Sequence, residues 1–446
     1  MNKGWYIVAI GLLAAAAVAA LFASGLLLGP PPGGPVTPGD GGGPAQGPVL
    51  TTFVDLTGCV FREPPTDPLR PPTFRLLTLP DFPGSYAIWG ATGRDAQGRV
   101  YIAGCSANVP IPSAHLFEYD PGQDRLTDLG DVISELRRAG VAREGEGQMK
   151  IHSKIVQAED GHLYFASMDE QGERTNGSQL PTWGGHLWRL RLPEKRWEHL
   201  LASPEALIAV SAAGRWVYAL GYFDHVLYQY DCRTGKVRSV HVGAAGGHIS
   251  RNFLTDHRGH AFVPRLKPAA NGTGLVTTLV ELDPDLRELA ETPIEHYSQS
   301  TDDDSHGIVS FQPLADRSIV FATDQGFLYR VAPGDGGAAR VTEVGWFHPR
   351  REAYVASMFT FDGQRHLLGL SQKSWQGGER YEWLVFDLAT GKSTAVPVQL
   401  PDWGAPMNGM LLYGSVTRDN EGAFYVVGVA DQKGRSMPVL YRASLP

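Results

Sequence analysis

The most regular feature of the chain is a pair of short, alternating apolar runs joined by a polar turn. Residues 150–168, KIHSKIVQAEDGHLYFASM, contain two such runs on either side of Asp160-Gly161. Alternation with a period of two around a tight Asp-Gly turn predicts a β-hairpin. One hairpin cannot bury both of its apolar faces, so stacked copies are expected. Six variants of the pattern occur, at residues 90–104, 207–221, 249–265, 307–323, 355–370 and 411–428.

A third apolar run follows each hairpin, and several of these runs end in an acidic residue. They lie at residues 115–120, 186–190, 226–231, 278–283, 327–331, 383–387 and 439–442. In most repeats a short turn such as Thr234-Gly-Lys then leads to a fourth run. Seven units of four strands, spaced by roughly 40 to 60 residues, predict an all-β fold, a seven-bladed β-propeller of four-stranded antiparallel blades.

The last repeat runs out of chain after its third strand, so its fourth strand must come from elsewhere. Residues 73–79, TFRLLTL, are the best candidate for a ring-closing strand, because an unpaired edge would invite other chains to pair with it. Residues 131–143 carry Ile133, Leu136 and Val141 roughly on one side, which predicts a helix between the first two blades.

Residues 1–29 are of a different character and are predicted to be a membrane anchor or a signal peptide. Residues 5–28 form an uncharged run of 24 residues, which as a helix measures about 36 Å against a hydrocarbon core of about 30 Å. This length favours a retained transmembrane helix, and the small residues at 14–20 leave a cleaved signal peptide as the alternative. Lys3 precedes the run, which predicts that the rest of the chain lies on the extracytoplasmic side of the membrane, in the periplasm or outside the cell. If the N-terminus is cleaved, the protein is predicted to be secreted.

Residues 30–50 are a linker, since 14 of the 19 residues from 30 to 48 are Pro or Gly. The propeller is then assigned to residues 51–446. The formal net charge is -8 at pH 7 and no basic cluster stands out, which argues against nucleic acid as a partner. Cys59, Cys105 and Cys232 lie far apart and lack the spacing of a metal or redox motif.

Long insertions fall at one end of the predicted strands. In an up-and-down blade, the connections between strands two and three and those between blades lie on the same face of the disc. All the long segments are of these two kinds, which predicts one loop-rich face that carries function. They are residues 131–149, 169–185, 267–276, 291–305 and 371–382.

Histidines gather on the loop-rich face. His152, His248 and His306 stand at or just before the start of three inner strands, where side chains approach the central axis. Three converging imidazoles can hold one divalent metal ion or transfer protons, and Asp169, Glu170 and the acids at 302–304 are available to complete a metal site. The alternative is that these histidines cap strands through backbone hydrogen bonds.

Other polar and aromatic residues on this face suggest what a ligand would be. Arginine pairs with carboxylates, and aromatic rings pack on the apolar faces of sugars, so the predicted ligand is a small anionic organic molecule or an acidic oligosaccharide. The alternative is that these residues are scattered singly over the surface. The candidate binding residues are Lys154, His186, Arg251, Asn252, Trp375 and Arg380.

Two of the repeats resemble blades of the NHL and streptogramin-lyase type of propeller. Ser305-His-Gly-Ile-Val opens an inner strand with a His-Gly pair, and His152-Ser-Lys-Ile-Val followed by Asp160-Gly is similar. The resemblance covers the repeats from about residue 84 onward. It implies metal-assisted elimination by histidines together with an acid. Oligogalacturonate lyases are a second propeller family with a metal site rich in histidine.

Two functional hypotheses follow. In the first, the protein is a lyase or hydrolase acting on an anionic carbohydrate or similar ligand, with His152, His248 and His306 holding a divalent metal or relaying protons and Arg251 neutralising a carboxylate. In the second, it is a non-catalytic, membrane-tethered module whose loop-rich face docks a partner protein or a ligand. An enzyme should have a deep axial pocket, whereas a docking module should have a broad apolar patch.

Overall fold

The computed structural model describes residues 67–174, 178–244, 250–298, 307–360, 364–375, 378–401, 408–413 and 417–446. All of them belong to the compact unit Val49–Pro446. The predicted anchor or signal peptide, residues 1–29, and the linker, residues 30–50, lie outside the described residues. Within the described ranges, no helix has both the length and the apolar character needed to cross a membrane.

In the described ranges, thirty strands form seven antiparallel sheets, and there is one α-helix. Blade 1 contains β2 (Ser85–Ala87), β3 (Thr92–Arg94), β4 (Val100–Ser106), β5 (His115–Asp120) and β6 (Arg125–Asp131). Blade 2 contains β7 (Lys150–Ile151), β8 (Val156–Gln157), β9 (Leu163–Met168), β10 (Gly185–Arg191) and β11 (Arg196–Ser203). In both blades the inner strand is divided into two short pieces that pair with the same neighbour.

The middle blades each have four strands in chain order. Blade 3 contains β12 (Leu207–Ala213), β13 (Trp216–Gly221), β14 (Val226–Asp231) and β15 (Val237–His241). Blade 4 contains β16 (Leu254–Thr255), β17 (Ala261–Pro268), β18 (Leu275–Leu282) and β19 (Glu288–Pro293). Blade 5 contains β20 (Ile308–Pro313), β21 (Ile319–Thr323), β22 (Phe327–Ala332) and β23 (Arg340–Trp346).

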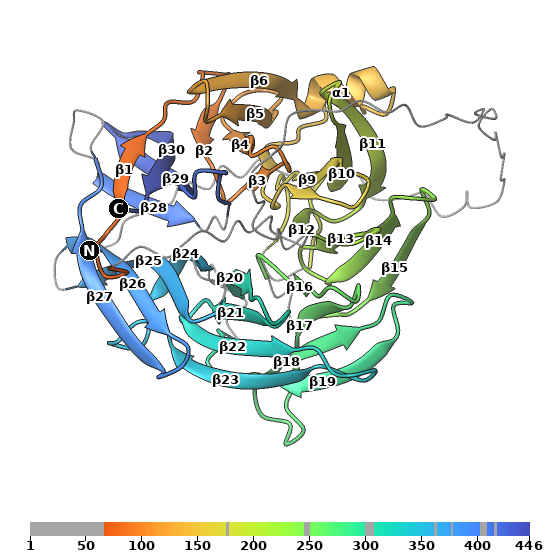
Figure 1. The fold of residues 1–446 in the computed structure, drawn as a ribbon. Helices are drawn as coiled ribbons and strands as arrows, with labels where there is room; N and C mark the ends of the chain where they lie inside the picture. The colour runs from red at the N-terminus through yellow and green to blue at the C-terminus, as the bar shows by residue number, and fades with distance from the viewer. Residues whose placement is uncertain are drawn as a thin grey trace, which may run out of the picture. The chain divides into compact units, whose positions relative to one another are not determined.

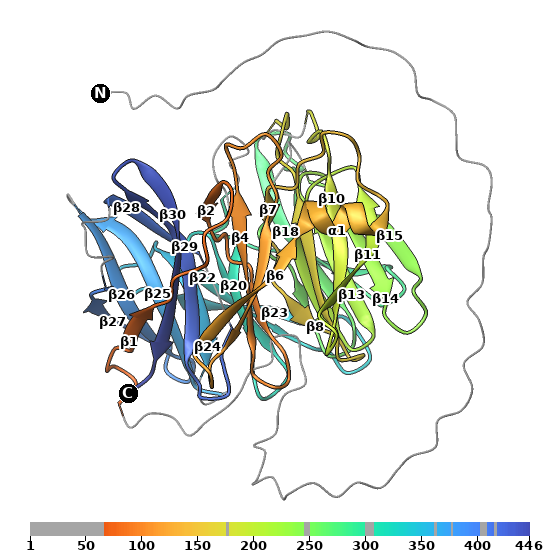
Figure 2. The same ribbon diagram turned by 90° about the horizontal axis from the view of Figure 1, so that it is seen from above.

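The last two blades complete the ring. Blade 6 contains β24 (Tyr354–Thr360), β25 (His366–Trp375), β26 (Gly378–Asp387) and β27 (Lys392–Val398). Blade 7 contains β28 (Asn408–Tyr413), β29 (Phe424–Gln432), β30 (Arg435–Ser444) and β1 (Thr73–Leu76). Figure 1 shows the blades following one another around a centre, and Figure 2 shows them from the side. The predicted seven-bladed propeller of four-stranded antiparallel blades is confirmed.

Apolar side chains between neighbouring blades form the core. Tyr101 of β4, Phe165 of β9 and Trp188 of β10 belong to one buried cluster shared by blades 1 and 2. Trp383 of β26 stacks on Phe424 of β29 between blades 6 and 7, with ring centroids 5.8 Å apart. Burying one large apolar side chain contributes about 1.5 to 3 kcal/mol. Each blade therefore depends on both of its neighbours for stability, as the hairpin pattern predicts.

The aspartates of the repeated turns have a structural role. Asp95 accepts hydrogen bonds from the backbone of Arg99 and from the hydroxyl of Tyr101, each at 3.0 Å. Asp419 likewise accepts from two backbone N–H groups and, at 2.8 Å, from the hydroxyl of Tyr425. A carboxylate in such a turn satisfies backbone donors that the tight turn leaves without partners, which explains why an acid recurs at the hairpin turns.

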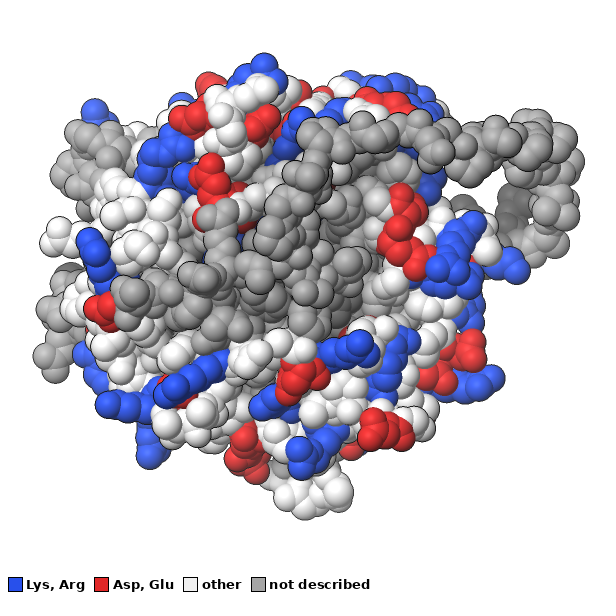
Figure 3. All heavy atoms as spheres, viewed as in Figure 1, with Lys and Arg blue, Asp and Glu red and all other residues white. Residues whose placement is uncertain are grey.

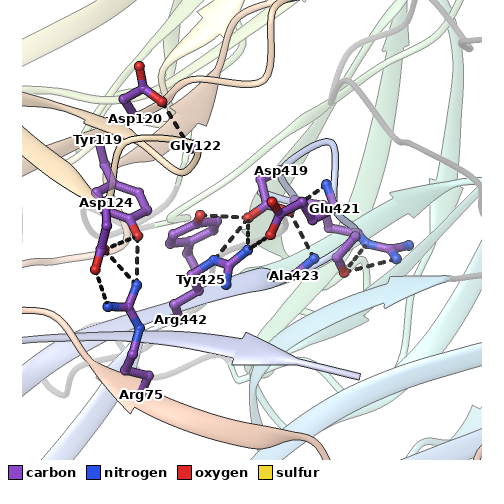
Figure 4. A network of polar contacts seen from close by, with 12 residues as sticks. Arg75, Tyr119, Asp120, Gly122, Asp124, Asp419, Glu421, Ala423, Tyr425 and Arg442 are labelled. Carbon is purple, nitrogen blue, oxygen red and sulfur yellow. Dashed lines mark hydrogen bonds and ion pairs between the residues drawn. The ribbon is translucent and has the colours of Figure 1, made fainter. Parts of the chain in front are cut away.

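The ring is closed by the N-terminal strand β1. It pairs antiparallel with β30, from Thr73 opposite Ser444 to Leu76 opposite Tyr441, so four of the residues predicted at 73–79 form the closing strand. Arg75 also donates to Asp124 and to the hydroxyl of Tyr119 in blade 1, all at 2.7 Å. Figure 4 shows this contact beside the Asp419 turn. The closing strand thereby joins the last blade to the first.

The helix α1 (Val132–Ala139) lies beside β6 and β11. It begins after Asp131, whose side chain accepts a hydrogen bond from the backbone of Ser134 at 3.0 Å. It ends at Gly140, which has a left-handed conformation (φ 73°). The predicted helix over 131–143 is therefore correct at its start but too long at its end. Val141 lies beyond the helix and is 40% exposed.

One of the predicted insertions, residues 371–382, is largely strand. Its described residues extend the β25–β26 hairpin, with register from Ser371 opposite Glu382 out to Trp375 opposite Gly378. The polar composition of this segment suggests a loop, but backbone hydrogen bonding between strands does not need apolar side chains, so the ladder continues past the core. At residues 267–276, β17 ends at Pro268 and β18 begins at Leu275, and the residues between them form a loop as predicted.

Deleting residues 1–76 should destabilise the propeller much more than deleting residues 1–66, because only the longer deletion removes β1. The loss includes the packing of Phe74 against Phe424 and Tyr441 and the bonds of Arg75. We expect the melting temperature of the longer deletion to be lower by about 5 °C or more. Equal melting temperatures for the two truncations would contradict a stabilising role for this closure.

A buried carboxyl group lies between blades 2 and 3. Glu205 is 2% exposed, and its Oε2 accepts from the backbone of Phe223 at 3.4 Å and of Asp224 at 3.3 Å. The space opposite is taken by Gly221, where an added Cβ would lie 1.9 Å from Oε1. Burial raises the pKa of Glu205 to about 7, so folding favours its protonated form.

This raised pKa gives the stability a pH dependence with a definite sign. Between the ordinary pKa of 4.5 and the folded value of about 7, the folded state holds a proton that the unfolded state has lost. Stability should therefore fall as the pH rises, by at most about 1.4 kcal/mol per pH unit. Glu205→Gln should make this fall less steep in denaturant unfolding measured at pH 4.5 to 7, and the parts due to the raised pKa values of Asp169 and Glu173 should remain. The exposed control Glu144→Gln should keep the full slope, and an unchanged slope in Glu205→Gln would refute the assignment.

Candidate functional site

Two predicted site residues meet where the inner strands begin. His152 follows β7 in blade 2, and Arg251 precedes β16 in blade 4. Arg251 Nη1 donates to His152 Nε2 at 2.6 Å, although the two residues are 99 positions apart. A guanidinium group has only donors, so in this contact the imidazole is neutral and carries its proton on Nδ1. The ring therefore places the permanently charged Arg251 beside the neutral side chain of His152.

Aromatic rings from two further blades adjoin this pair. The guanidinium carbon of Arg251 lies 5.1 Å from the ring centroid of Tyr413 at the end of β28. Trp89, between β2 and β3, meets Tyr413 edge-on at 4.5 Å between ring centroids, and its indole N–H donates to the hydroxyl of Tyr86 at 2.9 Å. Arg251 thus reaches from blade 4 to a ring of blade 7, on the opposite side of the axis.

A second cation lies over the ring of Trp89. Lys150 Nζ is 5.2 Å from the centroid of the Trp89 ring and 2.5 Å from Glu170 Oε1. A cation over an aromatic face is attracted by the negative charge density of the ring. We refer to Trp89, Lys150, His152, Arg251 and Tyr413 as the axial cluster. It draws on blades 1, 2, 4 and 7.

Acidic residues after β9 border the axial cluster. Asp169 accepts hydrogen bonds from the backbone of Gln171 at 3.0 Å and of Trp183 at 3.1 Å, which fixes both ends of the segment. Burial raises the pKa of Asp169 to about 6. Burial and the nearby charge of Glu170 raise the pKa of Glu173 to about 9, although Lys150 acts in the opposite direction. Near neutral pH, Glu173 is therefore protonated.

Lys154 and Asn252 lie deeper than predicted for residues at an open mouth. Lys154 is 8% exposed, and its Nζ is 5.9 Å from the centroid of the Phe311 ring on β20. Burial lowers its pKa to about 8. The amide nitrogen of Asn252 donates to the carbonyls of Ile308 at 2.9 Å and Val309 at 3.2 Å, so this side chain fastens blade 4 to blade 5.

His186 begins β10, as the sequence suggests, but it takes part in a separate buried network. It is 2% exposed, with Nε2 3.0 Å from Glu146 Oε1 and Nδ1 2.9 Å from His199 Nε2. Burial acts to raise the pKa of Glu146, but hydrogen bonds from His186 and Arg143 outweigh burial and lower this pKa to about 2. Burial lowers the pKa of His199 to about 4. The network ties the segment before β7 to blade 2, which indicates a structural role.

The remaining predicted residues lie outside the described ranges or on the strands of the extended hairpin. His248 and His306 lie outside the described residues, so a metal site formed by them with His152 stays a prediction. Among the residues that the structure does describe, no group of three or more His, Cys, Asp or Glu is placed to hold a metal ion. Trp375 and Arg380 are on strands β25 and β26 of the extended hairpin, and not on a loop as predicted.

Sequence reasoning missed Trp89, Lys150 and Tyr413. The first hairpin was expected to start at residue 90, but β2 pairs Ser85 and Ala87 with β4, so the inner edge of blade 1 starts earlier. Trp89 then falls within that edge. Extending the apolar alternation back to residue 85 would have found it. Contacts across the axis, such as that of Arg251 with Tyr413, have no signal in a single sequence.

No protein-family model matches the chain, and no curated protein matches it. Solved structures similar to it include that of U3-55K, at 11% identity and a TM-score of 0.48, covering 83% of this chain and 98% of that one. A protein of unknown function from Dyadobacter fermentans has 11% identity, a TM-score of 0.47 and coverage of 84% and 99%. A polysaccharide lyase, an ulvan lyase, has 11% identity, a TM-score of 0.43 and coverage of 81% and 93%. Likenesses at this level say nothing of function; the sheets and their register define the chain as a seven-bladed β-propeller.

Proposed function

We propose that the protein binds a small anionic organic molecule, such as an acidic carbohydrate, at the axial cluster. The supporting observation is the position of Arg251, whose guanidinium group lies between His152 Nε2 at 2.6 Å and the ring of Tyr413 at 5.1 Å. A guanidinium group can pair with a carboxylate through two parallel hydrogen bonds. The half-buried ring of Trp89 offers apolar surface for the carbon skeleton of a ligand.

The charge distribution suits a small ligand better than a polyanion. The chain has 39 Lys and Arg against 47 Asp and Glu. On the face viewed in Figure 3, basic and acidic side chains are interspersed around the ring. Such a surface does not steer a nucleic acid or a long acidic polymer by its overall field. Recognition of an anion therefore depends on the few cations of the axial cluster.

A lyase activity on that ligand is a second candidate, and the contact between His152 and Arg251 favours it. A ligand carboxylate that takes the guanidinium hydrogen bonds would release His152 Nε2 as a proton acceptor next to the carbon bearing the carboxylate. Arginine would stabilise the charge that develops when this carbon loses its proton, and the neutral imidazole would accept the proton. This proposal retains the streptogramin-lyase likeness, with His248, His306 and a divalent metal as further participants.

Replacing Arg251 by Ala should weaken galacturonate binding by at least about tenfold, because a charge-assisted pair with a carboxylate is lost. Arg251→Lys should recover part of the affinity, since it keeps the charge but not the planar pair of donors. Calorimetry with galacturonate, and with glucose as the uncharged comparison, gives both values. The exposed control Arg233→Ala should bind as the unmodified chain does, and melting temperatures show whether each variant is folded.

Two results would reject the anion site. One is galacturonate affinity that is the same with and without Arg251, and the other is binding of glucose as tight as that of galacturonate.

The alternative function would then be a non-catalytic module that docks a partner protein. For that reading, Ile111, Val141 and Leu180 on the loop-rich face are exposed apolar side chains. Their replacement by Ser would then be expected to weaken partner binding without affecting the axial cluster.

We also propose that the propeller is extracytoplasmic and tethered to the membrane by residues 1–29 through the Pro- and Gly-rich linker 30–50. Made in a bacterial host, the full chain should sediment with membranes, dissolve only with detergent and keep its original N-terminus, because the run 5–28 is long enough to span the bilayer. Fractionation and N-terminal sequencing measure this. A soluble periplasmic species beginning near residue 20 to 25 would instead support the cleaved signal peptide.

A further inference from the structure

The inner strands of blades 1, 3 and 5 share one irregularity near their start. In each of them the register with the second strand shifts by one residue, so that one residue is left out of the ladder. This extra residue is Ile208 in blade 3 and Val309 in blade 5, and both lie in buried apolar clusters. In blade 1 it is Tyr86. A bulge redirects the side chain of the extra residue, and of these three side chains only that of Tyr86 carries a hydroxyl group.

The hydroxyl group of the half-buried Tyr86 contacts the indole N–H of Trp89. The distance from Trp89 Nε1 to Tyr86 Oη is 2.9 Å. An indole N–H can only donate, so the oxygen of Tyr86 accepts in this contact. Within the described ranges no residue accepts the proton of Tyr86 itself. A hydroxyl group whose oxygen already accepts a hydrogen bond is a stronger donor, because neighbouring hydrogen bonds polarise one another.

Trp89 connects this donor to the axial cluster. Its ring meets that of Tyr413 at 4.5 Å between centroids, and the guanidinium carbon of Arg251 lies 5.1 Å from the Tyr413 centroid. A ligand that pairs its carboxylate with Arg251 and packs its carbon skeleton on Trp89 would therefore have the hydroxyl group of Tyr86 at the edge of the same indole ring. A tyrosine hydroxyl keeps its proton at neutral pH, so Tyr86 is available there as a donor.

We propose that Tyr86 donates its hydroxyl proton to a neutral oxygen of the ligand, and that this contact makes the axial cluster selective for hydroxylated acids of the sugar-acid class. This inference rests on the proposed anion site and names the ligand class of that site. A simple carboxylic acid has no oxygen to spare for Tyr86. A site built to bind a ligand oxygen discriminates against an analogue that lacks it, because the polar group of the protein is then left without a partner.

Calorimetry with two acids of the same ring size tests the proposal on the purified full-length chain. Galacturonate carries hydroxyl groups and a ring oxygen, whereas cyclohexanecarboxylate carries the carboxylate alone. We expect galacturonate to bind more tightly to the unaltered chain. Tyr86→Phe should weaken galacturonate binding by about threefold to tenfold, because a hydrogen bond to a neutral oxygen is lost. The affinity for cyclohexanecarboxylate should change by less than about twofold, since it makes no such bond.

Tyr228→Phe is the matched control. Tyr228 on β14 is also half-buried, and its hydroxyl oxygen likewise accepts a hydrogen bond, from Ser203 at 3.1 Å. It belongs to blade 3 and makes no contact named for the axial cluster, so its replacement should leave the ratio of the two affinities unchanged. Melting temperatures show whether each variant is folded. If Tyr86→Phe weakens both acids equally, Tyr86 has a packing role only, and the proposal is wrong.

The contact with Tyr86 and the anion site fail separately. Both acids should lose affinity in Arg251→Ala, because both have a carboxylate to pair with the guanidinium group. If they do, and Tyr86→Phe leaves the ratio of their affinities unchanged, the inference on Tyr86 is overturned and the anion site stands. Affinities that do not depend on Arg251 reject the anion site and the inference together.

A structure of the unaltered chain with galacturonate decides the question even if Tyr86→Phe does not fold. We expect Tyr86 Oη to lie within about 3.0 Å of a hydroxyl or ring oxygen of the sugar. A contact with the carboxylate alone, or a distance above about 3.5 Å to every oxygen of the ligand, would overturn the proposal.

Discussion

The closure of the ring by β1 is the constraint on which the rest of the structure depends. A twisted four-stranded sheet has two apolar faces, and each blade covers one face of the next. This arrangement leaves two uncovered faces and a free edge unless the last blade meets the first. Pairing of β1 with β30, together with the bonds from Arg75 to Asp124, makes that junction. The interface between blades 7 and 1 thereby forms in addition to the six interfaces between consecutive blades.

Closure also fixes the distances across the axis. The inner edges of blades 2, 4 and 7 are separated in sequence by about a hundred residues or more, yet a single arginine side chain contacts both His152 and Tyr413. Lys154 reaches in the same way from blade 2 to Phe311 of blade 5. Long cationic side chains therefore occupy the interior of the ring, where burial of a charge is expensive unless something compensates for it. Because burying a charge costs free energy, these residues are better candidates for a functional role than arginines at the surface.

The sequence predicts the structural features that depend on local pattern. It does not predict the contacts that depend on the geometry of the ring. Alternation around short polar turns identifies all seven blades, and Asp131 identifies the start of α1, because these signals act within a few residues. Strand lengths beyond the core were underestimated at residues 371–382, since backbone pairing continues there without apolar side chains. The sequence predicts that His152 and Arg251 both lie on the inner edges of their blades, and the structure has His152 between β7 and β8 and Arg251 before β16. Their contact, and that of Arg251 with Tyr413, depends on which blades face one another across the axis, and nothing in the order of residues specifies this.

For the proposed anion site, the charges near the axis matter more than the net charge of the protein. Lys150 is offset by Glu170, which lies 2.5 Å away. Glu173 is protonated near neutral pH, because burial and Glu170 raise its pKa to about 9, and so it does not cancel a second positive charge. His152 is neutral. Because a buried region has a lower dielectric constant than water, Arg251 would act on the proposed ligand more strongly than the net charge of -8 spread over the surface.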